Sequence, residues 1–114
     1  MSKKDEKKDL TCKFSLRSLE VNGPDGNPIL DRMTQKKFEL DKLLSNSLYM
    51  SQSGGKDDSL KKAIFAQKLF EHGFIEIDKT DLKLLQKWVD AAGFTTAIAI
   101  VLYEELERCE ESLK

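Results

Sequence analysis

The sequence predicts a mainly α-helical domain with a minor β component (α+β), in which an N-terminal β-hairpin packs on a bundle of about four helices. Apolar residues recur at three- and four-residue steps in four segments, as on one face of a helix. Near the N-terminus the apolar period changes to two, which is typical of a strand. The longest nearly uncharged apolar run begins the segment Phe94–Leu113, and it predicts the helix around which the others pack.

The length of 114 residues is enough for one domain with its own core. Hydrophobic residues make up 39% and charged residues 34%, so most of the chain is expected to fold. Residues Met1–Leu10 alternate Lys with Asp and Glu and are expected to form a disordered charged arm. The helical domain with its hairpin therefore spans residues 11–114. A net charge of −1 gives the whole chain no general attraction to nucleic acid or membrane.

The first predicted element of the domain is the hairpin. Residues Cys12–Val21 alternate apolar and polar side chains, with one slip near Ser18. The turn Asn22–Pro28 concentrates Gly, Pro, Asn and Asp, and Ile29–Leu30 are expected to return as the second strand. An isolated hairpin is marginal in water, so we expect it to lie against the helices.

Two helices should follow the hairpin. Thr34 is placed to cap a helix over Gln35–Met50, whose buried stripe is Leu40, Leu43, Leu44 and Leu48. The next helix, Leu60–His72, is expected to end at Gly73. Its predicted buried residues are Leu60, Ala63, Ala66, Leu69 and Phe70, with Ile64 and Phe65 widening the face.

An extended crossing and a third helix come next. Phe74–Ile77 alternates and is too short for a helix, so it can add a short strand beside the hairpin. Asp78 should cap the helix Lys79–Ala92, with Trp88 at the edge of its buried stripe. That stripe consists of Leu82, Leu85, Val89 and Ala92.

The last helix should begin with Thr95 or Thr96 as its cap, after a left-handed Gly93. Its apolar face is Ile98, Leu102, Leu106, Cys109 and Leu113, and Ala97, Ile100 and Val101 widen this face until the first two turns are buried on several sides. The acidic second half is expected to be a solvated tail that frays, and the alternative is an acidic docking surface.

The sequence offers little catalytic or metal-binding chemistry. Cys12 and Cys109 are remote from each other, and we interpret both as reduced, small hydrophobic residues. A zinc site needs three or four converging ligands, and the single histidine, His72, lies at a predicted helix end. We therefore expect no enzyme activity, no metal and no cofactor. No apolar run is long enough to span a bilayer, and the N-terminus lacks the apolar region of a signal peptide.

Partner-binding residues are expected on the last two helices. Lys79, Lys83 and Lys87 are spaced four apart beside Trp88, which suits an ordinary solvated face, a protein-docking face or a grip on phosphate and a stacked base. The acidic counterparts are Glu104, Glu107 and Glu111. The basic stripe of one copy could meet the acidic end of another, so self-association is a further expectation.

The order of these parts resembles a group of small proteins encoded by tailed bacteriophages and prophages. The resemblance lies in the following pieces: Asp25-Gly-Asn-Pro28, Lys61–Gly73, Ile75-Glu-Ile-Asp78, Asp81–Val89 and Ala97–Leu106. It implies a phage-encoded accessory protein that acts in the cytoplasm of a bacterial host or in association with the virion. It supplies no functional residues to carry over.

The leading functional hypothesis is a non-catalytic phage or prophage accessory protein that binds another protein, either in particle assembly or by capturing a host protein. The alternative is a nucleic-acid-binding accessory factor that uses Lys79, Lys83 and Lys87. The near-neutral charge and the five glutamates of the last helix disfavour this alternative.

Overall fold

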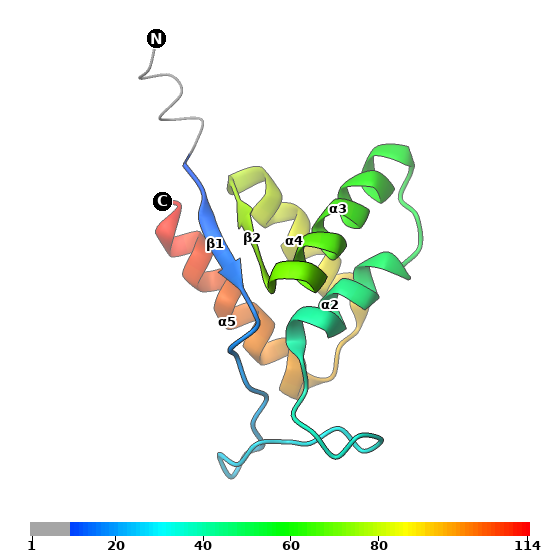
Figure 1. Cartoon of the computed structure of the whole chain (residues 1–114). Coiled ribbons are helices and arrows are strands. Elements are labelled where there is room, and N and C mark those ends of the chain that lie inside the picture. Colours follow the sequence, from blue (N-terminus) through cyan, green and yellow to red (C-terminus); the bar gives the residue numbers. More distant parts are fainter. Residues whose placement is uncertain (1–9) are drawn as a thin grey trace.

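A computed structural model describes residues 10–114, and Met1–Asp9, which hold most of the predicted charged arm, lie outside the described residues. In the described part, four helices surround one two-stranded antiparallel sheet, which confirms the mainly α fold class (Figure 1). The elements in chain order are β1 (Cys12–Ser15), α2 (Leu40–Tyr49), α3 (Lys56–His72), β2 (Phe74–Ile77), α4 (Lys79–Ala92) and α5 (Thr96–Ser112).

The sheet pairs the N-terminal strand β1 with β2, the short strand predicted at 74–77. Cys12 lies opposite Ile77, and Ser15 lies opposite Phe74. Alternation places one face inward, where Ile77 is fully buried, and leaves Glu76 on the exposed face. Each of the two strands was predicted, but their direct pairing was not, because the strand beside β1 comes from a distant part of the sequence.

The prediction of a return strand at Ile29–Leu30 is wrong, because no strand forms there. The turn does reverse the chain, because the N–H of Ile29 donates to the carbonyl oxygen of Val21 at 2.8 Å and Asn22 and Pro28 form an isolated bridge. The pairing goes no further into a ladder, and Leu30 remains 46% exposed. Two isoleucines on β2 bury more apolar surface against the helices than this pair could, so β2 takes the place beside β1.

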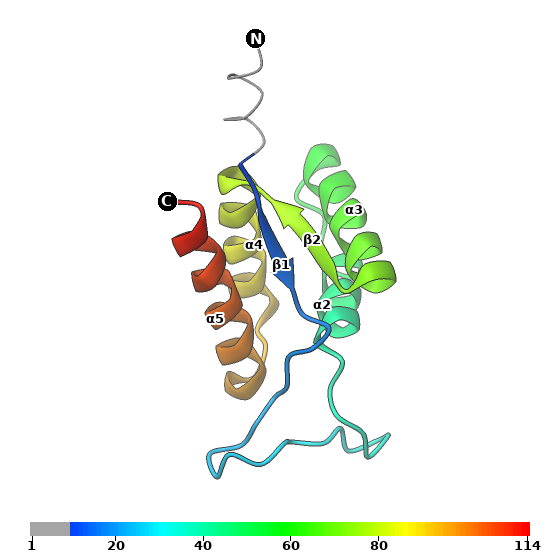
Figure 2. The same ribbon diagram turned by 60° about the vertical axis from the view of Figure 1, so that its left-hand side comes forward.

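The helices lie along both edges of the sheet and cover one of its faces, while the face that carries Glu76 stays exposed (Figure 2). α5 lies beside β1 and α3 lies beside β2, while α4 packs behind the sheet and α2 packs on α3 (Figure 2). The largest fully buried side chains come from every element: Phe14, Leu16, Leu40, Leu44, Leu69, Ile75, Ile77, Leu85, Leu102, Leu106 and Leu113. One core therefore joins residues from both ends of the described chain.

Helix α2 begins five residues later than predicted, because the residues before it form turns. The carboxylate of Asp31 accepts the N–H groups of Met33 and Thr34, at 2.7 and 3.2 Å. The N–H of Asp31 donates to the carbonyl oxygen of Lys36, and Gln35 has a positive φ of 60°. These hydrogen bonds stabilise turns in residues 31–36 that are incompatible with a helix, so Thr34 is not the helix cap.

Helix α4 has the predicted cap, and this cap forms a complete capping box. Asp78 accepts the N–H of Asp81 at 2.8 Å, and the Asp81 carboxylate accepts the N–H of Asp78 at 3.3 Å. We expect Asp78→Ala to lower the free energy of unfolding by about 1 kcal/mol, as measured by urea denaturation. The matched control is Asp57→Ala, in the first turn of α3, because Asp57 is exposed and caps nothing. Equal losses for the two variants would contradict this account.

The apolar face of α5 is confirmed, but it is narrower than predicted. All five residues of the main stripe are buried, whereas Ile100 is 49% exposed, and on α4 the last stripe residue, Ala92, is exposed as well. α5 contacts α4 and β1 only on one side, so nothing covers Ile100. The acidic end, expected to be a frayed tail, is helical as far as Ser112, and Leu113, which is 1% exposed, anchors it in the core.

Candidate protein-binding surfaces

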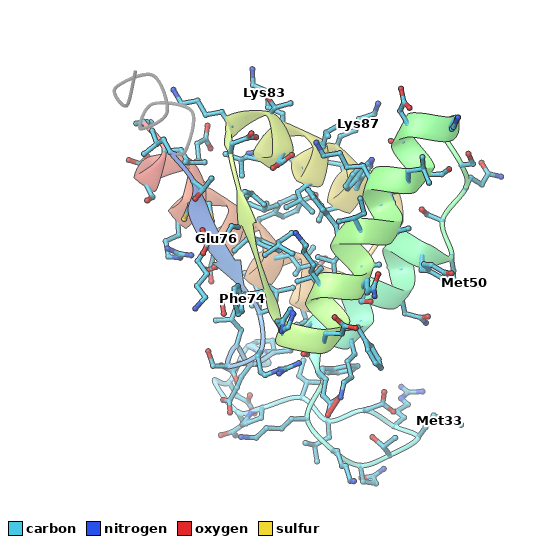
Figure 3. The ribbon with its side chains drawn as sticks, turned by 45° about the horizontal axis from the view of Figure 1, so that its top comes forward. Met33, Met50, Phe74, Glu76, Lys83 and Lys87 are labelled. Carbon is cyan, nitrogen blue, oxygen red and sulfur yellow. The ribbon has the colours of Figure 1, made fainter. Side chains whose placement is uncertain are left out.

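The predicted basic stripe lies on the exposed side of α4. Lys83 and Lys87 extend away from the body of the protein (Figure 3). Neither these two nor Lys79 forms an ion pair with any residue in the range 10–114. Lys79 and Lys83 line a shallow groove of about 190 Å³ between α4 and α5, where Glu110 and Lys114 line the α5 side.

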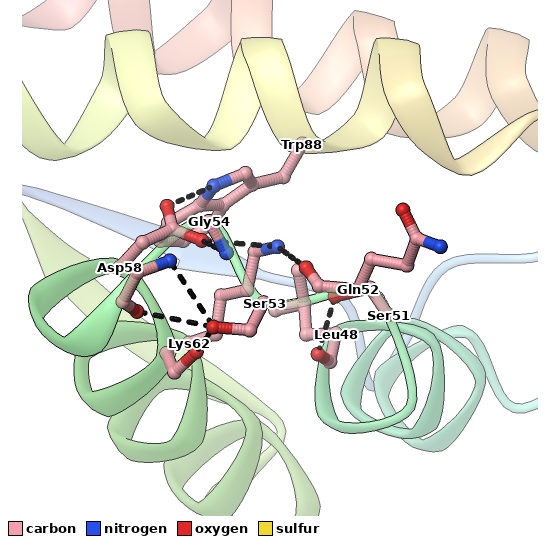
Figure 4. A network of polar contacts seen from close by, with 10 residues as sticks. Leu48, Ser51, Gln52, Ser53, Gly54, Asp58, Lys62 and Trp88 are labelled. Atoms are coloured by element: carbon pink, nitrogen blue, oxygen red, sulfur yellow. Dashed lines mark hydrogen bonds and ion pairs between the residues drawn. The ribbon is translucent and has the colours of Figure 1, made fainter.

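Trp88 lies on the buried side of α4 and belongs to the core, whereas these lysines are exposed. It is 6% exposed, its ring packs edge-on against Phe65 at 5.7 Å, and its Nε1 donates to Asp58 Oδ1 at 3.1 Å. Asp58 also pairs with Lys62 at 3.2 Å and accepts the N–H of Gly54, so the loop before α3 is tied to α4 (Figure 4). The burial of Trp88 disfavours the alternative in which a base stacks on it, and the other two interpretations of the lysine stripe stay predictions.

Desolvation works to raise the pKa of Asp58, but hydrogen bonds from Lys62 and Trp88 outweigh it, and the pKa is lowered. The folded state therefore favours the carboxylate at neutral pH. The contribution of this network to stability should be lost only as the pH falls into the acid range.

The acidic residues of α5 separate into two groups. Glu104, Glu107 and Glu111 are exposed, and Glu111 pairs with Lys114 at 3.1 Å. Glu105 is instead 8% exposed and bonds to the edge of β1. The first group remains available as an acidic surface, and its role in binding stays a prediction.

A larger surface, the α2–α3 groove, was not predicted. We use this name for the open groove of about 980 Å³ between α2, α3 and the turn before α2. Phe38, Tyr49 and Phe70 provide aromatic side chains along it, and Ala63 and Ala66 make its floor shallow and apolar. Tyr49 is 69% exposed and Phe70 is 57% exposed.

The groove continues onto a face of α3 that was expected to be buried. Leu60, Ile64 and Phe70 are 55%, 51% and 57% exposed, while only Phe65, Ala66 and Leu69 of this helix are buried. The apolar residues of α3 occupy more of its circumference than the neighbouring elements cover. That excess was visible in the sequence, and it was the available signal for an exposed apolar surface.

Lysines border the α2–α3 groove. Lys42 pairs with Glu39 at 3.2 Å and lies 5.6 Å from the centre of the Phe70 ring, and Lys37 pairs with Glu20 at 2.5 Å. Lys36 also lines the groove and forms no ion pair within residues 10–114. All the paired side chains are between 44% and 63% exposed, so these pairs contribute little stability and can exchange partners.

Residues 10–114 contain no group of three or more Cys, His, Asp or Glu side chains placed to hold a metal ion. None of the helices in that range combines the length and apolarity needed to cross a bilayer. A scan of protein-family models and searches of curated proteins and of solved structures found no match to this chain.

Proposed function

We propose that this chain is a non-catalytic protein-binding module that uses the α2–α3 groove. The observation that carries the proposal is the pair of aromatic side chains, Tyr49 and Phe70, which stay 69% and 57% exposed on either wall of the groove. Exposed aromatic side chains that line a recessed surface are enriched among the residues that dominate protein–protein binding. Leu60 and Ile64 extend the same apolar surface along α3.

The partner segment that fits this surface is an amphipathic helix with apolar residues on one side and acidic residues at its edges. A groove formed by two helices accepts a third helix through apolar side chains spaced three and four residues apart. Lys36, Lys37 and Lys42 border the groove and complement acidic residues on the incoming helix. Lys37 and Lys42 would exchange their weak surface pairs for pairs with the partner.

The phage or prophage origin that the sequence resemblance implies is part of this proposal, as is the role in particle assembly or in capture of a host protein. The partner is then a structural protein of the particle or a protein of the host. Mass spectrometry of purified particles and of the lysate of infected cells would distinguish the two. Presence in the particles would support assembly, and presence in the lysate alone would support a host-directed role.

The test of the groove compares the natural chain with Phe70→Glu and with a matched control, Ile100→Glu. Ile100 is 49% exposed but lies on α5, on the far side of the sheet from α3. A protein captured from the lysate by the natural chain is purified, and its Kd is measured by calorimetry. We expect Phe70→Glu to weaken binding at least about tenfold, since central aromatic residues of an interface contribute more than about 1 kcal/mol.

Ile100→Glu should leave the Kd of that partner unchanged, and circular dichroism should show that both variants fold. A partner that binds all three proteins equally would have its site elsewhere and would contradict the proposed groove. Loss of binding with Ile100→Glu alone would contradict it as well.

Nucleic-acid binding is the second candidate, and the observation in its favour is that Lys79, Lys83 and Lys87 are exposed without ion pairs among residues 10–114. Binding through these lysines should weaken steeply as salt rises, and Lys83→Glu should abolish it. Single-stranded and duplex DNA titrations at two salt concentrations provide the measurement. Absence of salt-dependent binding in both titrations would remove this candidate.

A further inference from the structure

The two cysteines, remote in sequence, converge between the first strand and the last helix. Cys12 lies on β1 and Cys109 on α5, and these two elements run side by side (Figure 2). Both thiols donate to the same acceptor, the carbonyl oxygen of Lys13, over sulfur–oxygen distances of 3.8 Å for Cys12 and 3.7 Å for Cys109. A shared acceptor atom places the two sulfur atoms close to each other.

The surroundings of the two thiols disfavour the thiolate form of Cys109. Burial, followed by a hydrogen bond with the Cys12 side chain, raises the pKa of Cys109 to about 12. The side chains are almost fully enclosed, with 5% of Cys12 and none of Cys109 exposed. Both cysteines are free thiols in this structure, and no metal-ligand cluster among residues 10–114 includes them.

We propose that Cys12 and Cys109 are a site of reversible oxidation, at which hydrogen peroxide converts the two thiols into an intramolecular disulfide that joins β1 to α5. The geometry carries this proposal, because two thiols with one acceptor in common need only small side-chain rotations to approach each other. Arg108 Nη2 shares this site, since it donates to the same carbonyl oxygen and lies 3.7 Å from Cys109 Sγ.

The reaction balances with peroxide as the oxidant. The sulfur of Cys12, the more exposed of the two, attacks one peroxide oxygen as a thiolate, breaks the O–O bond and forms a sulfenic acid with release of hydroxide. The sulfur of Cys109 then displaces the sulfenic oxygen and forms the S–S bond. The thiol protons leave with the oxygens, so two thiols and one peroxide give one disulfide and two waters.

The neighbouring charge helps the second step. Arg108 Nη2 lies 3.7 Å from Cys109 Sγ, and a guanidinium at that distance stabilises a thiolate. Because the pKa of Cys109 is raised, the thiolate is scarce at neutral pH, and the rate of disulfide formation should increase as the pH rises.

The disulfide would close nearly the whole described chain into one loop. Such a crosslink restricts the unfolded chain, and the expected increase in Tm is roughly 10 °C or more. Reduction with dithiothreitol should reverse this increase. The N-terminal strand and the C-terminal helix would then respond together to the oxidation state.

The test treats the purified full-length chain with hydrogen peroxide, unfolds it in acid, alkylates the free thiols and measures the intact mass. We expect the natural chain to lose two hydrogen atoms and to take up no alkyl group, with faster conversion at pH 9 than at pH 7. Cys12→Ser and Cys109→Ser serve as controls, and each should instead gain oxygen atoms or keep one alkylated thiol. Cys12→Ala is a second variant for the case in which serine unfolds the buried site.

A natural chain that keeps two alkylated thiols, under conditions that oxidise the same chain in urea, would overturn the proposal. Gain of oxygen atoms without loss of two hydrogen atoms would overturn it too. A disulfide that forms without any rise in Tm would mean that the bond strains the native fold, and this would contradict the native proximity of the two thiols.

Discussion

Replacing Glu105 with Ala is expected to lower the free energy of unfolding by about 3 kcal/mol, because this carboxylate completes the outer edge of β1. Its Oε2 atom accepts the N–H of Ser15 at 2.9 Å and a hydrogen bond from Arg108 Nη2 at 2.7 Å. Arg108 also donates to the carbonyl oxygen of Lys13. An edge strand otherwise exposes such groups to water or to a strand of another molecule. Side chains of α5 therefore replace the missing neighbouring strand.

Glu104→Ala is the matched control, because Glu104 is the adjacent residue, is exposed, and its side chain makes no hydrogen bond or ion pair with residues 10–114. Its effect should stay within about 0.5 kcal/mol. The loss of stability for Glu105→Gln should lie between those of the two alanine variants. Its amide oxygen can still accept the N–H of Ser15 but carries no negative charge to pair with Arg108. Urea denaturation monitored by circular dichroism measures all three. Equal effects for Glu104→Ala and Glu105→Ala would contradict the edge-covering role.

Sequence reasoning succeeded where a structure depends on residues within one or two turns. Asp78 and Asp81 form a capping box because both partners lie three residues apart. Gly73 and Gly93 end their helices in left-handed conformations, as their positions predicted. The stripe on α5 is buried because its spacing fixes which residues share a face.

It did not succeed where two distant segments compete for one neighbour. The turn Asn22–Pro28 is a strong local signal, and it favoured a hairpin with Ile29–Leu30. β1 pairs instead with Phe74–Ile77, because Ile75 and Ile77 complete the core between α3 and α4. The alternation of residues 74–77 predicted a strand, but a pattern within one strand does not indicate which other strand pairs with it.

The same limit applies to the surfaces. Lysines spaced four apart share one face of α4, and a charged face is exposed whichever elements pack on the other face. Their exposure could therefore be predicted from the sequence. Phe70 and Tyr49 form one groove only because α2 and α3 pack side by side, and a pattern within one helix holds no information about that neighbour. Trp88 illustrates the converse, because Asp58 from α3 accepts its N–H and allows its burial.

Replacing Gly73 with Ala is expected to lower the free energy of unfolding by about 3 kcal/mol, because the substitution introduces both backbone strain and a steric clash. Its φ is +81°, a left-handed conformation that strains any residue with a Cβ. A Cβ there would also lie 2.7 Å from both Cβ and Nε of Arg17, which is too close for either atom to stay in place. Arg17 Cβ is attached to the backbone, so the turn that follows β1 would have to move.

That movement would disturb a partly buried ion pair. Arg17 Nη2 lies 3.0 Å from Asp41 Oδ2, and Asp41 is only 3% exposed. Displacing Arg17 leaves this carboxylate without its cation, which adds to the cost. The carbonyl oxygen of Gly73 also accepts the N–H of Leu16 at 2.9 Å. Gly73 therefore connects α3 to β2 and also contacts the chain just after β1.

Gly26→Ala separates the two penalties. Gly26 has nearly the same φ, +85°, but a Cβ there would meet no atom within 4 Å. Its cost should therefore be the backbone strain alone, about 1 kcal/mol, and the difference between the two variants measures the close contact with Arg17. Thermal and urea unfolding of both variants provide the comparison. Equal losses of stability in the two variants would mean that Arg17 moves aside at no cost. The close packing of Arg17 against the end of α3 would then not require a glycine at position 73.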